Sequence, residues 1–180
     1  MVRINRFMVE EIAKLGNPNR VAGRNWELRV LPVTAHVALG RVTWATPNGR
    51  KTGEPLSEGS GPQQGCDTRG PTALLNSIAK FPPRDSKHWC SPLLNIKLSP
   101  SALAGETGTE KLVALLKGWH RLRIWHIQAN CISAETLRAA QKDPEKYRNL
   151  IVRVAGFSAF FTELDKGTQD EIIARTEHTF

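Results

Sequence analysis

The sequence predicts an α/β fold made of one compact unit. Segments rich in apolar and β-branched residues alternate with segments whose apolar residues recur every three or four positions, which is typical of strands and helices packed in layers. A chain of 180 residues can bury one medium-sized core. Its composition, with 40% hydrophobic and 23% charged residues, is that of a globular protein.

The N-terminal part of the chain predicts a helix followed by an extended segment. Residues 9–15 form a short amphipathic pattern that ends at a Gly-Asn-Pro sequence. Residues 28–39 have extended character, interrupted by one proline. His36 lies there among small apolar residues, which favours a core histidine over a catalytic one. We therefore divide the chain into residues 1–27, an N-terminal helix and basic segment, and residues 28–180, a single domain.

Residues 40–70 are predicted to be mostly loop. Glycine or proline stands at five of the ten positions between residues 53 and 62, and Asn48-Gly49 gives a turn signal. Such a long irregular stretch inside a compact protein is usually functional or packed against other elements. It is not a Walker-type phosphate loop, because the sequence around Arg50 lacks the required Gly-Lys-Thr order.

The rest of the chain alternates helices and strands. Each helix prediction depends on a capping residue or on regularly spaced apolar residues, and each strand prediction on a short run of apolar and β-branched residues. The expected elements are a helix over residues 73–80 with Thr72 as its N-cap, a strand over 93–98, a helix over 108–117 that continues toward Trp119, a strand that starts with residues 124–128 and ends near Cys131, a helix that starts after Ser133, a new helical start at Asp143-Pro144, and a last helix opened by a capping box at Thr168–Glu171.

The net charge of +8 does not by itself predict a nucleic-acid-binding protein. Between residues 1 and 51, nine Lys or Arg accompany three Glu, but the basic residues are scattered singly, with no run and no alternating basic-aromatic platform. A solvated face, or a face that docks on another protein, explains the excess better. We therefore expect no nucleic acid among the partners.

Membrane, disulfide and metal signals are weak or absent in the sequence. No stretch is long and apolar enough to cross a membrane, and the charged opening residues lack the apolar centre of a signal peptide, so a cytoplasmic location is expected. The three cysteines, Cys66, Cys90 and Cys131, are widely spaced and odd in number, which is typical of reduced thiols. His88 and Cys90 have no second ligand pair nearby, so no metal site is predicted.

The stretch from Ile151 to Phe161 carries the strongest functional signal. Five residues rich in β-branched and apolar types lead to Gly156, so the pattern predicts a buried strand that ends at a tight loop. Taken alone, Gly156 indicates a positive φ or a close backbone approach. A second interpretation is chemical, because a glycine Cα can lose a hydrogen atom and the resulting radical is delocalised between the amide nitrogen and the carbonyl group.

This stretch resembles the radical-bearing loop of the glycyl radical enzyme family, which is pyruvate formate-lyase-like. The matching residues are Arg153, Val154, Ala155, Gly156, Ser158 and Ala159, with Phe157 in place of a tyrosine. The resemblance covers roughly residues 17 to 180. Further stretches match family motifs in the right order, namely Gly40–Arg50, Gly53–Leu56, Gly65–Ala73, Leu94–Ala102, His126–Gln128, Ala140–Tyr147 and Ile172–Glu177.

The resemblance implies a fold, a partner and a mechanism. Residues 28–180 would be the C-terminal part of a ten-stranded α/β barrel, with the Gly156 loop inserted toward its centre and buried from water and oxygen. No cofactor would be bound, because the radical is stored on Gly156 itself. A separate activating enzyme that uses S-adenosylmethionine and an iron-sulfur cluster would remove the hydrogen atom. The radical would then pass to a cysteine on a second loop, and this thiyl radical would attack the substrate.

The chain departs from the family pattern at the thiyl cysteine. That residue usually lies in a Gly-Cys-x-Glu loop, whereas Gly65-Cys66 is followed by Thr68 at the glutamate position, so Cys66 is not assigned the thiyl role. Trp44 stands at the position of a family glycine, which alters the packing near the site. The chain is thus expected to hold a radical but not to turn over substrate alone.

Three functions are compatible with the sequence. The first is the radical-bearing part of a glycyl radical lyase, decarboxylase or dehydratase, completed by the remainder of that enzyme. The second is a spare-part protein that docks on a damaged full-length enzyme carrying the thiyl cysteine and restores its radical. The third is a structural or binding domain whose glycine loop is inactive.

Overall fold

The computed structural model describes residues 2–15, 26–81, 88 and 93–180. Its helices are α1 (Val2–Lys14), α2 (Ala35–Arg41), α3 (Pro71–Ile78), α4 (Gly105–Arg121), α5 (Ala134–Lys142) and α6 (Lys166–Ala174), with short 3-10 helices at Pro100–Leu103 and Phe161–Glu163. Its strands are β1 (Leu93–Leu98), β2 (His126–Cys131), β3 (Ile151–Arg153), β4 (Ser158–Phe160) and β5 (Glu177–His178).

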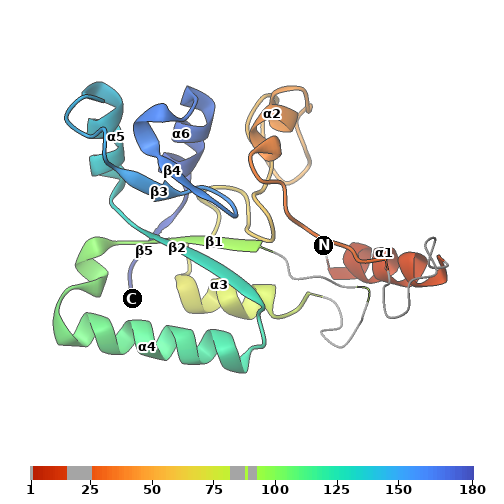
Figure 1. Cartoon of the computed structure of the whole chain (residues 1–180). Coiled ribbons are helices and arrows are strands. Elements are labelled where there is room, and N and C mark those ends of the chain that lie inside the picture. The colour runs from red at the N-terminus through yellow and green to blue at the C-terminus, as the bar shows by residue number, and fades with distance from the viewer. Residues whose placement is uncertain (1, 16–25, 82–87, 89–92) are drawn as a thin grey trace.

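The elements form layers around a small parallel sheet. Among the described residues, β1 lies between β2 and β5, and both neighbours run parallel to it. Helices α3 and α4 lie on one side of the sheet, and the antiparallel hairpin of β3 and β4 lies on the other side with α5 and α6 (Figure 1). This arrangement confirms the predicted α/β class.

The first apolar core fills the space between the sheet and the helices α3 and α4. Leu94, Ile96 and Leu98 alternate along β1 and are almost fully buried. They pack with Leu75 of α3 and Leu115 of α4. Because successive side chains of a strand point to opposite faces, the intervening residues of β1 face the hairpin.

The second apolar core lies between the hairpin and the helices α5 and α6. Val152, Phe161 and Ile172 have at most 1% of their surface exposed, and they pack with Leu137 of α5. Polar side chains of the sheet lie between the two cores. One of them, Lys97, is 1% exposed and donates from Nζ to the carbonyl of Ile173, 2.9 Å away. Burial lowers the pKa of this ammonium group, and the carbonyls at the C-terminal end of α6 satisfy it.

The N-terminal predictions need two corrections. Helix α1 begins at Val2, well before the predicted start at residue 9. The extended segment predicted for residues 28–39 is wrong in its second half, where α2 forms. His36 is buried in α2, as expected for a core histidine, and its Nε2 lies 3.5 Å from a carboxylate oxygen of Glu171. The division into residues 1–27 and 28–180 stays a prediction.

The long loop after α2 is held together from inside. Residues 42–70 are all described and contain no helix or strand, as predicted. The guanidinium of Arg50 is buried and donates to main-chain carbonyls of the same loop, at 2.9 Å from Lys51 and 2.7 Å from Glu54. The loop is also fixed to the C-terminal elements, because Asp67 lies 2.8 Å from His178 Nε2. The loop is thus packed against itself and against the C-terminal elements, as its length suggested.

Several predicted helix ends were wrong. Thr72 lies inside α3, and Gly70, with a φ of 85°, is the N-cap residue. Asp143-Pro144 begins a series of turns and not a helix. The strand predicted from residue 124 begins two residues later, at His126, and ends at Cys131 as predicted, whereas the predicted helix at residues 108–117 extends at both ends. Ser133 does cap α5, since its hydroxyl accepts from the Thr136 amide.

The last helix has a different cap from the one predicted. Thr168 lies within α6, and Asp165 is the N-cap, with its carboxylate accepting from the amides of Gly167 at 3.0 Å and Thr168 at 3.2 Å. Glu171 is therefore not part of a capping box. It is buried in a cluster with Arg175 at 2.7 Å and Gln64 at 3.0 Å.

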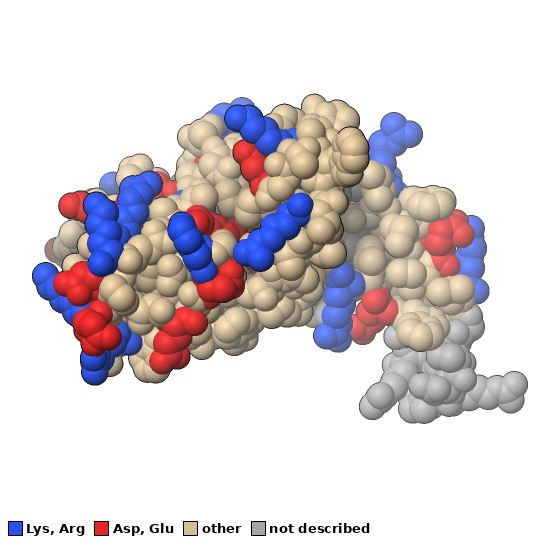
Figure 2. Space-filling model, turned by 90° about the horizontal axis from the view of Figure 1, so that it is seen from above, with Lys and Arg blue, Asp and Glu red and all other residues tan. Residues whose placement is uncertain are grey.

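Both charge signs are mixed on the face seen from above in Figure 2. Blue basic and red acidic side chains lie next to one another there, around a broad area of uncharged residues. No helix among the described residues has the length and apolarity that a membrane span requires.

Replacing Asp165 by Ala should lower the free energy of unfolding by about 1 kcal/mol, because two amides of the first turn of α6 lose their acceptor. The Asp165→Asn variant keeps a side-chain oxygen and should recover most of this loss. Urea denaturation of the three proteins measures the difference. Equal stability of Asp165→Ala and the parent chain would show that another residue caps α6.

Acid should destabilise the chain partly through Glu171. Burial alone would raise the pKa of Glu171, but hydrogen bonds and charge from His36, Arg175 and Gln64 lower it to about 2 from 4.5. A lowered folded-state pKa stabilises the fold above pH 4.5, and this contribution of about 3 kcal/mol is lost as the pH falls toward 2.

The measurement is the free energy of unfolding between pH 6 and pH 2. The Glu171→Gln variant should start less stable and show a shallower acid slope than the parent chain. Glu110, exposed on α4, provides the matched control, and Glu110→Gln should keep the parent slope. Parallel acid slopes in the parent chain and Glu171→Gln would contradict the assignment.

Candidate functional site

Gly156 lies at the turn of the β3–β4 hairpin. Its φ is 82°, a left-handed conformation that glycine adopts without strain. The turn is closed by the Val154 amide, which donates to the Phe157 carbonyl at 2.9 Å. Apart from Gly156 and its two chain neighbours, no heavy atom of the described residues lies within 4 Å of the position that a Cβ on Gly156 would occupy. The backbone conformation therefore requires glycine here, whereas the surrounding space does not.

Three amide side chains of the sheet hold the main chain of this hairpin. Asn95 on β1 donates to the Val154 carbonyl at 3.0 Å. Asn130 on β2 makes two bonds of 2.7 Å, donating to the carbonyl and accepting from the amide of Arg153. Gln128, also on β2, accepts from the Gly156 amide at 3.1 Å. The parallel register places Asn95 opposite Gln128, so these side chains share one face of the sheet.

The side chain of Arg153 connects the two strands of the hairpin to each other and to β2. Its Nε donates to Gln128 at 2.8 Å, and its terminal nitrogen donates to the Ser158 hydroxyl on the other strand at 3.2 Å. The carbonyl of Arg153 also accepts from Arg175 at 3.5 Å, which connects the hairpin to the Glu171 cluster of α6. Arg153 and Ser158 are thus placed to fix the shape of the loop.

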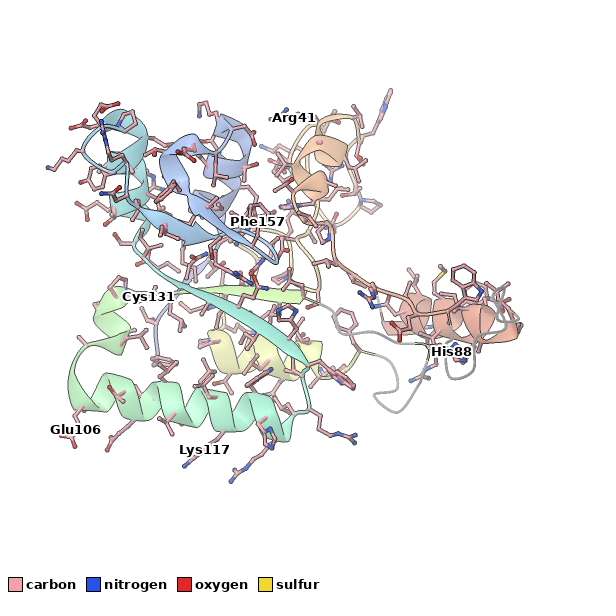
Figure 3. The ribbon with its side chains drawn as sticks, viewed as in Figure 1. Arg41, His88, Glu106, Lys117, Cys131 and Phe157 are labelled. Carbon is pink, nitrogen blue, oxygen red and sulfur yellow. The ribbon has the colours of Figure 1, made fainter. Side chains whose placement is uncertain are left out.

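The tip of the hairpin is open in this chain. Val154 and Ala155 are buried, and Ala159 packs against the second core, but Gly156 and Phe157 are exposed. Figure 3 shows Phe157 at the end of the hairpin. The expectation that the glycine is sealed from water is therefore wrong for this chain taken alone, because no described element covers the turn.

Two of the three cysteines lie in the part of the chain that the structure describes. Cys66 and Cys131 are both exposed free thiols. Cys131 alternates with Asn130 along β2, so it lies on the sheet face opposite to the hairpin. Cys66 lines a cleft of about 490 Å³ next to α3.

Metal ligands do not converge in the part of the chain that the structure describes. No group of three His, Cys, Asp or Glu side chains is arranged to bind an ion there. The His88 and Cys90 pair cannot be judged as a unit, since Cys90 lies outside the described residues. The His88 ring is described and has its Nδ1 at 2.9 Å from the Trp26 carbonyl.

The sequence motif indicated Gly156 as the candidate residue, but it did not indicate the side chains that hold its loop. Asn95 and Gln128 lie in stretches that match family motifs, yet their common direction follows only from the strand register. Nothing in the sequence indicated a role for Asn130. The ion pair of Glu171 with Arg175 has the spacing of one helical turn, which could have indicated a pair.

The comparisons with known proteins agree with this geometry. A family model described as glycine radical matches residues 56–162. The chain is 46% identical over 175 residues to isethionate sulfite-lyase of Bilophila wadsworthia, a match that covers 97% of the chain and 21% of that enzyme. It is 42% identical over 165 residues to trans-4-hydroxy-L-proline dehydratase of Clostridioides difficile, covering 92% of the chain and 20% of that enzyme.

A solved structure gives the same result at the level of the fold. The B12-independent glycerol dehydratase of Clostridium butyricum matches with a TM-score of 0.89 and 42% identity, over 99% of the chain and 22% of that structure. The chain therefore spans about a fifth of the length of these relatives. The matched residues include the complete β3–β4 hairpin with Gly156 at its turn. The chain belongs to the glycyl radical enzyme family.

Proposed function

We propose that the chain stores a backbone radical at Gly156 for a glycyl radical lyase, decarboxylase or dehydratase. A radical S-adenosylmethionine activating enzyme removes one hydrogen atom from the Gly156 Cα, and the carbon keeps one unpaired electron. The amide nitrogen donates electron density to this carbon and the carbonyl withdraws it, which stabilises the radical. The flanking residues Arg153 to Ala159 hold the loop in the shape that this chemistry needs.

One observation supports the proposal most directly. The main chain around Gly156 is fixed by hydrogen bonds to Asn95, Gln128 and Asn130, whereas the direction of a Cβ on Gly156 is open. The hydrogen atom that lies in this direction is accessible to an activating enzyme. A glycine needed only for its positive φ would not require three amide side chains to hold its neighbours.

We also propose that further protein supplies the thiyl cysteine and covers the hairpin. This protein is the remainder of a glycyl radical enzyme, or a full-length enzyme with its own cysteine loop, and together they form the ten-stranded barrel. Support comes from the exposed apolar side chains, which include Trp44 at 83%, Trp125 at 64% and Ile151 at 61% exposure. Such surfaces are typical of contacts with another protein. Covering them also excludes oxygen from the radical.

Anaerobic incubation with a radical S-adenosylmethionine activating enzyme should give an electron paramagnetic resonance doublet from the chain. The Gly156→Ala variant should give none, because alanine at a φ of 82° cannot form the same planar radical without strain.

Gly53 provides the matched control for this substitution. Its φ is 83° and it also has open space at the Cβ position, so Gly53→Ala imposes the same backbone strain at a distant turn. The Gly53→Ala variant should keep the doublet. Absence of a doublet in the parent chain with several activating enzymes, or its persistence in Gly156→Ala, would contradict radical storage at Gly156.

Air should cut the activated chain at Gly156, because oxygen adds to a carbon radical and the backbone then breaks. Mass spectrometry should detect a C-terminal fragment that begins near Phe157. Without activation, the parent chain should stay intact in air. The Gly156→Ala variant should stay intact even after incubation with the activating enzyme. Cleavage at another position would place the radical elsewhere.

A further inference from the structure

The side chain of Gln128 contacts the peptide group of the proposed radical residue itself. Gln128 is 7% exposed, and its Oε1 accepts from the Gly156 amide at 3.1 Å and from Arg153 Nε at 2.8 Å. Both of these groups can only donate a hydrogen bond. The oxygen of the Gln128 amide must therefore point toward the glycine loop.

The other end of the same amide is fixed as well. Its Nε2 lies 2.8 Å from His126 Nε2, two residues earlier on the same face of β2. An amide nitrogen can only donate, so His126 Nε2 must accept. The ring of His126 is then neutral, with its proton on Nδ1. A flipped Gln128 amide would place its Nε2 donor against the two donors of Gly156 and Arg153, so a single orientation satisfies all three partners.

This orientation has a consequence for a radical at Gly156. The unpaired electron spreads onto the amide nitrogen only while the amide plane is aligned with the half-filled orbital of the Cα. A hydrogen bond at the N–H restrains that plane, and it also increases the electron-donating strength of the nitrogen. Asn95 and Asn130 hold the neighbouring residues Val154 and Arg153, whereas Gln128 holds the peptide nitrogen of the radical residue.

We propose that Gln128 is a positioning residue of the radical site, which fixes the amide plane of Gly156 through Oε1 and is itself oriented by His126. This inference rests on the proposed storage of a radical at Gly156. It assigns to Gln128 an electronic role, since the distribution of the unpaired electron should depend on its carbonyl oxygen. A purely structural Gln128 would affect the stability of the hairpin but not the spectrum of the radical.

The test compares three variants of the full chain after anaerobic activation. Gln128→Met has a similar length but no acceptor, and it should change the α-hydrogen splitting of the doublet and shorten its half-life by roughly threefold or more. Gln128→Glu keeps an acceptor oxygen and should retain a spectrum close to that of the parent chain. Gln141→Met removes an amide of α5 that bonds Gln169 and Asp170 of α6 rather than the glycine turn, and it should change nothing.

A second measurement needs no substitution and no activation. The Gly156 amide should exchange with deuterium about tenfold more slowly than an unbonded exposed amide, although the residue is at the surface. Exchange at the rate of an unbonded amide would overturn the role of Gln128 even if Gln128→Met fails to fold.

The outcomes separate this inference from the proposal on which it rests. A doublet in the parent chain with unchanged splitting and half-life in folded Gln128→Met would overturn the role of Gln128 and leave radical storage intact. No doublet in the parent chain or any variant would contradict radical storage, and the electronic role of Gln128 with it. A changed spectrum in Gln128→Met, recovered in Gln128→Glu, supports the assignment.

Discussion

The structure depends on the polar side chains that one face of the parallel sheet buries and on the partners that they reach. The register of β1 with β2 places Asn95 opposite Gln128 and Lys97 opposite Asn130. These side chains are largely shielded from water between two apolar cores, where an unpaired polar group costs about 1–3 kcal/mol. They reach their partners only if the hairpin and the end of α6 lie where they do. The sheet therefore determines where the glycine turn is placed.

The two apolar cores contribute most of the free energy of unfolding, and the polar layer contributes less. A net hydrogen bond contributes about 1 kcal/mol, whereas burying a leucine, isoleucine or phenylalanine side chain contributes about 1.5–3 kcal/mol. The polar layer thus adds little to the total stability but strongly restricts the arrangement. Glu171 extends this layer into α6, since it joins Arg175 to Gln64 of the long loop. His36 of α2 lies 3.5 Å from the same carboxylate, so Glu171 brings together α2, the long loop and α6, which are distant in the sequence.

The sequence predicted the parts of the fold that depend on local pattern. The strand Leu93–Leu98 and the cap at Ser133 are as predicted, because each depends on neighbours in the chain. The helix at Ala35–Arg41 was missed because its β-branched and small residues also suit a strand, and tertiary packing of His36 decided the outcome. At the site, the motif indicated Gly156 as the candidate residue. The contacts of Gln128 and Asn130 with the hairpin could not be predicted from the sequence, because they form only when β2 lies beside β1.

The position of β2 in the sheet has a consequence for how this chain behaves in solution. Its one neighbour in the described part of the chain is β1, so the outer side of β2 presents main-chain N–H and C=O groups without a strand to bind them. Such an edge is a template onto which an extended segment of another molecule can add, and it favours side-by-side pairing of identical chains. A strand of another protein that occupies this edge first would extend the ladder and keep identical chains apart.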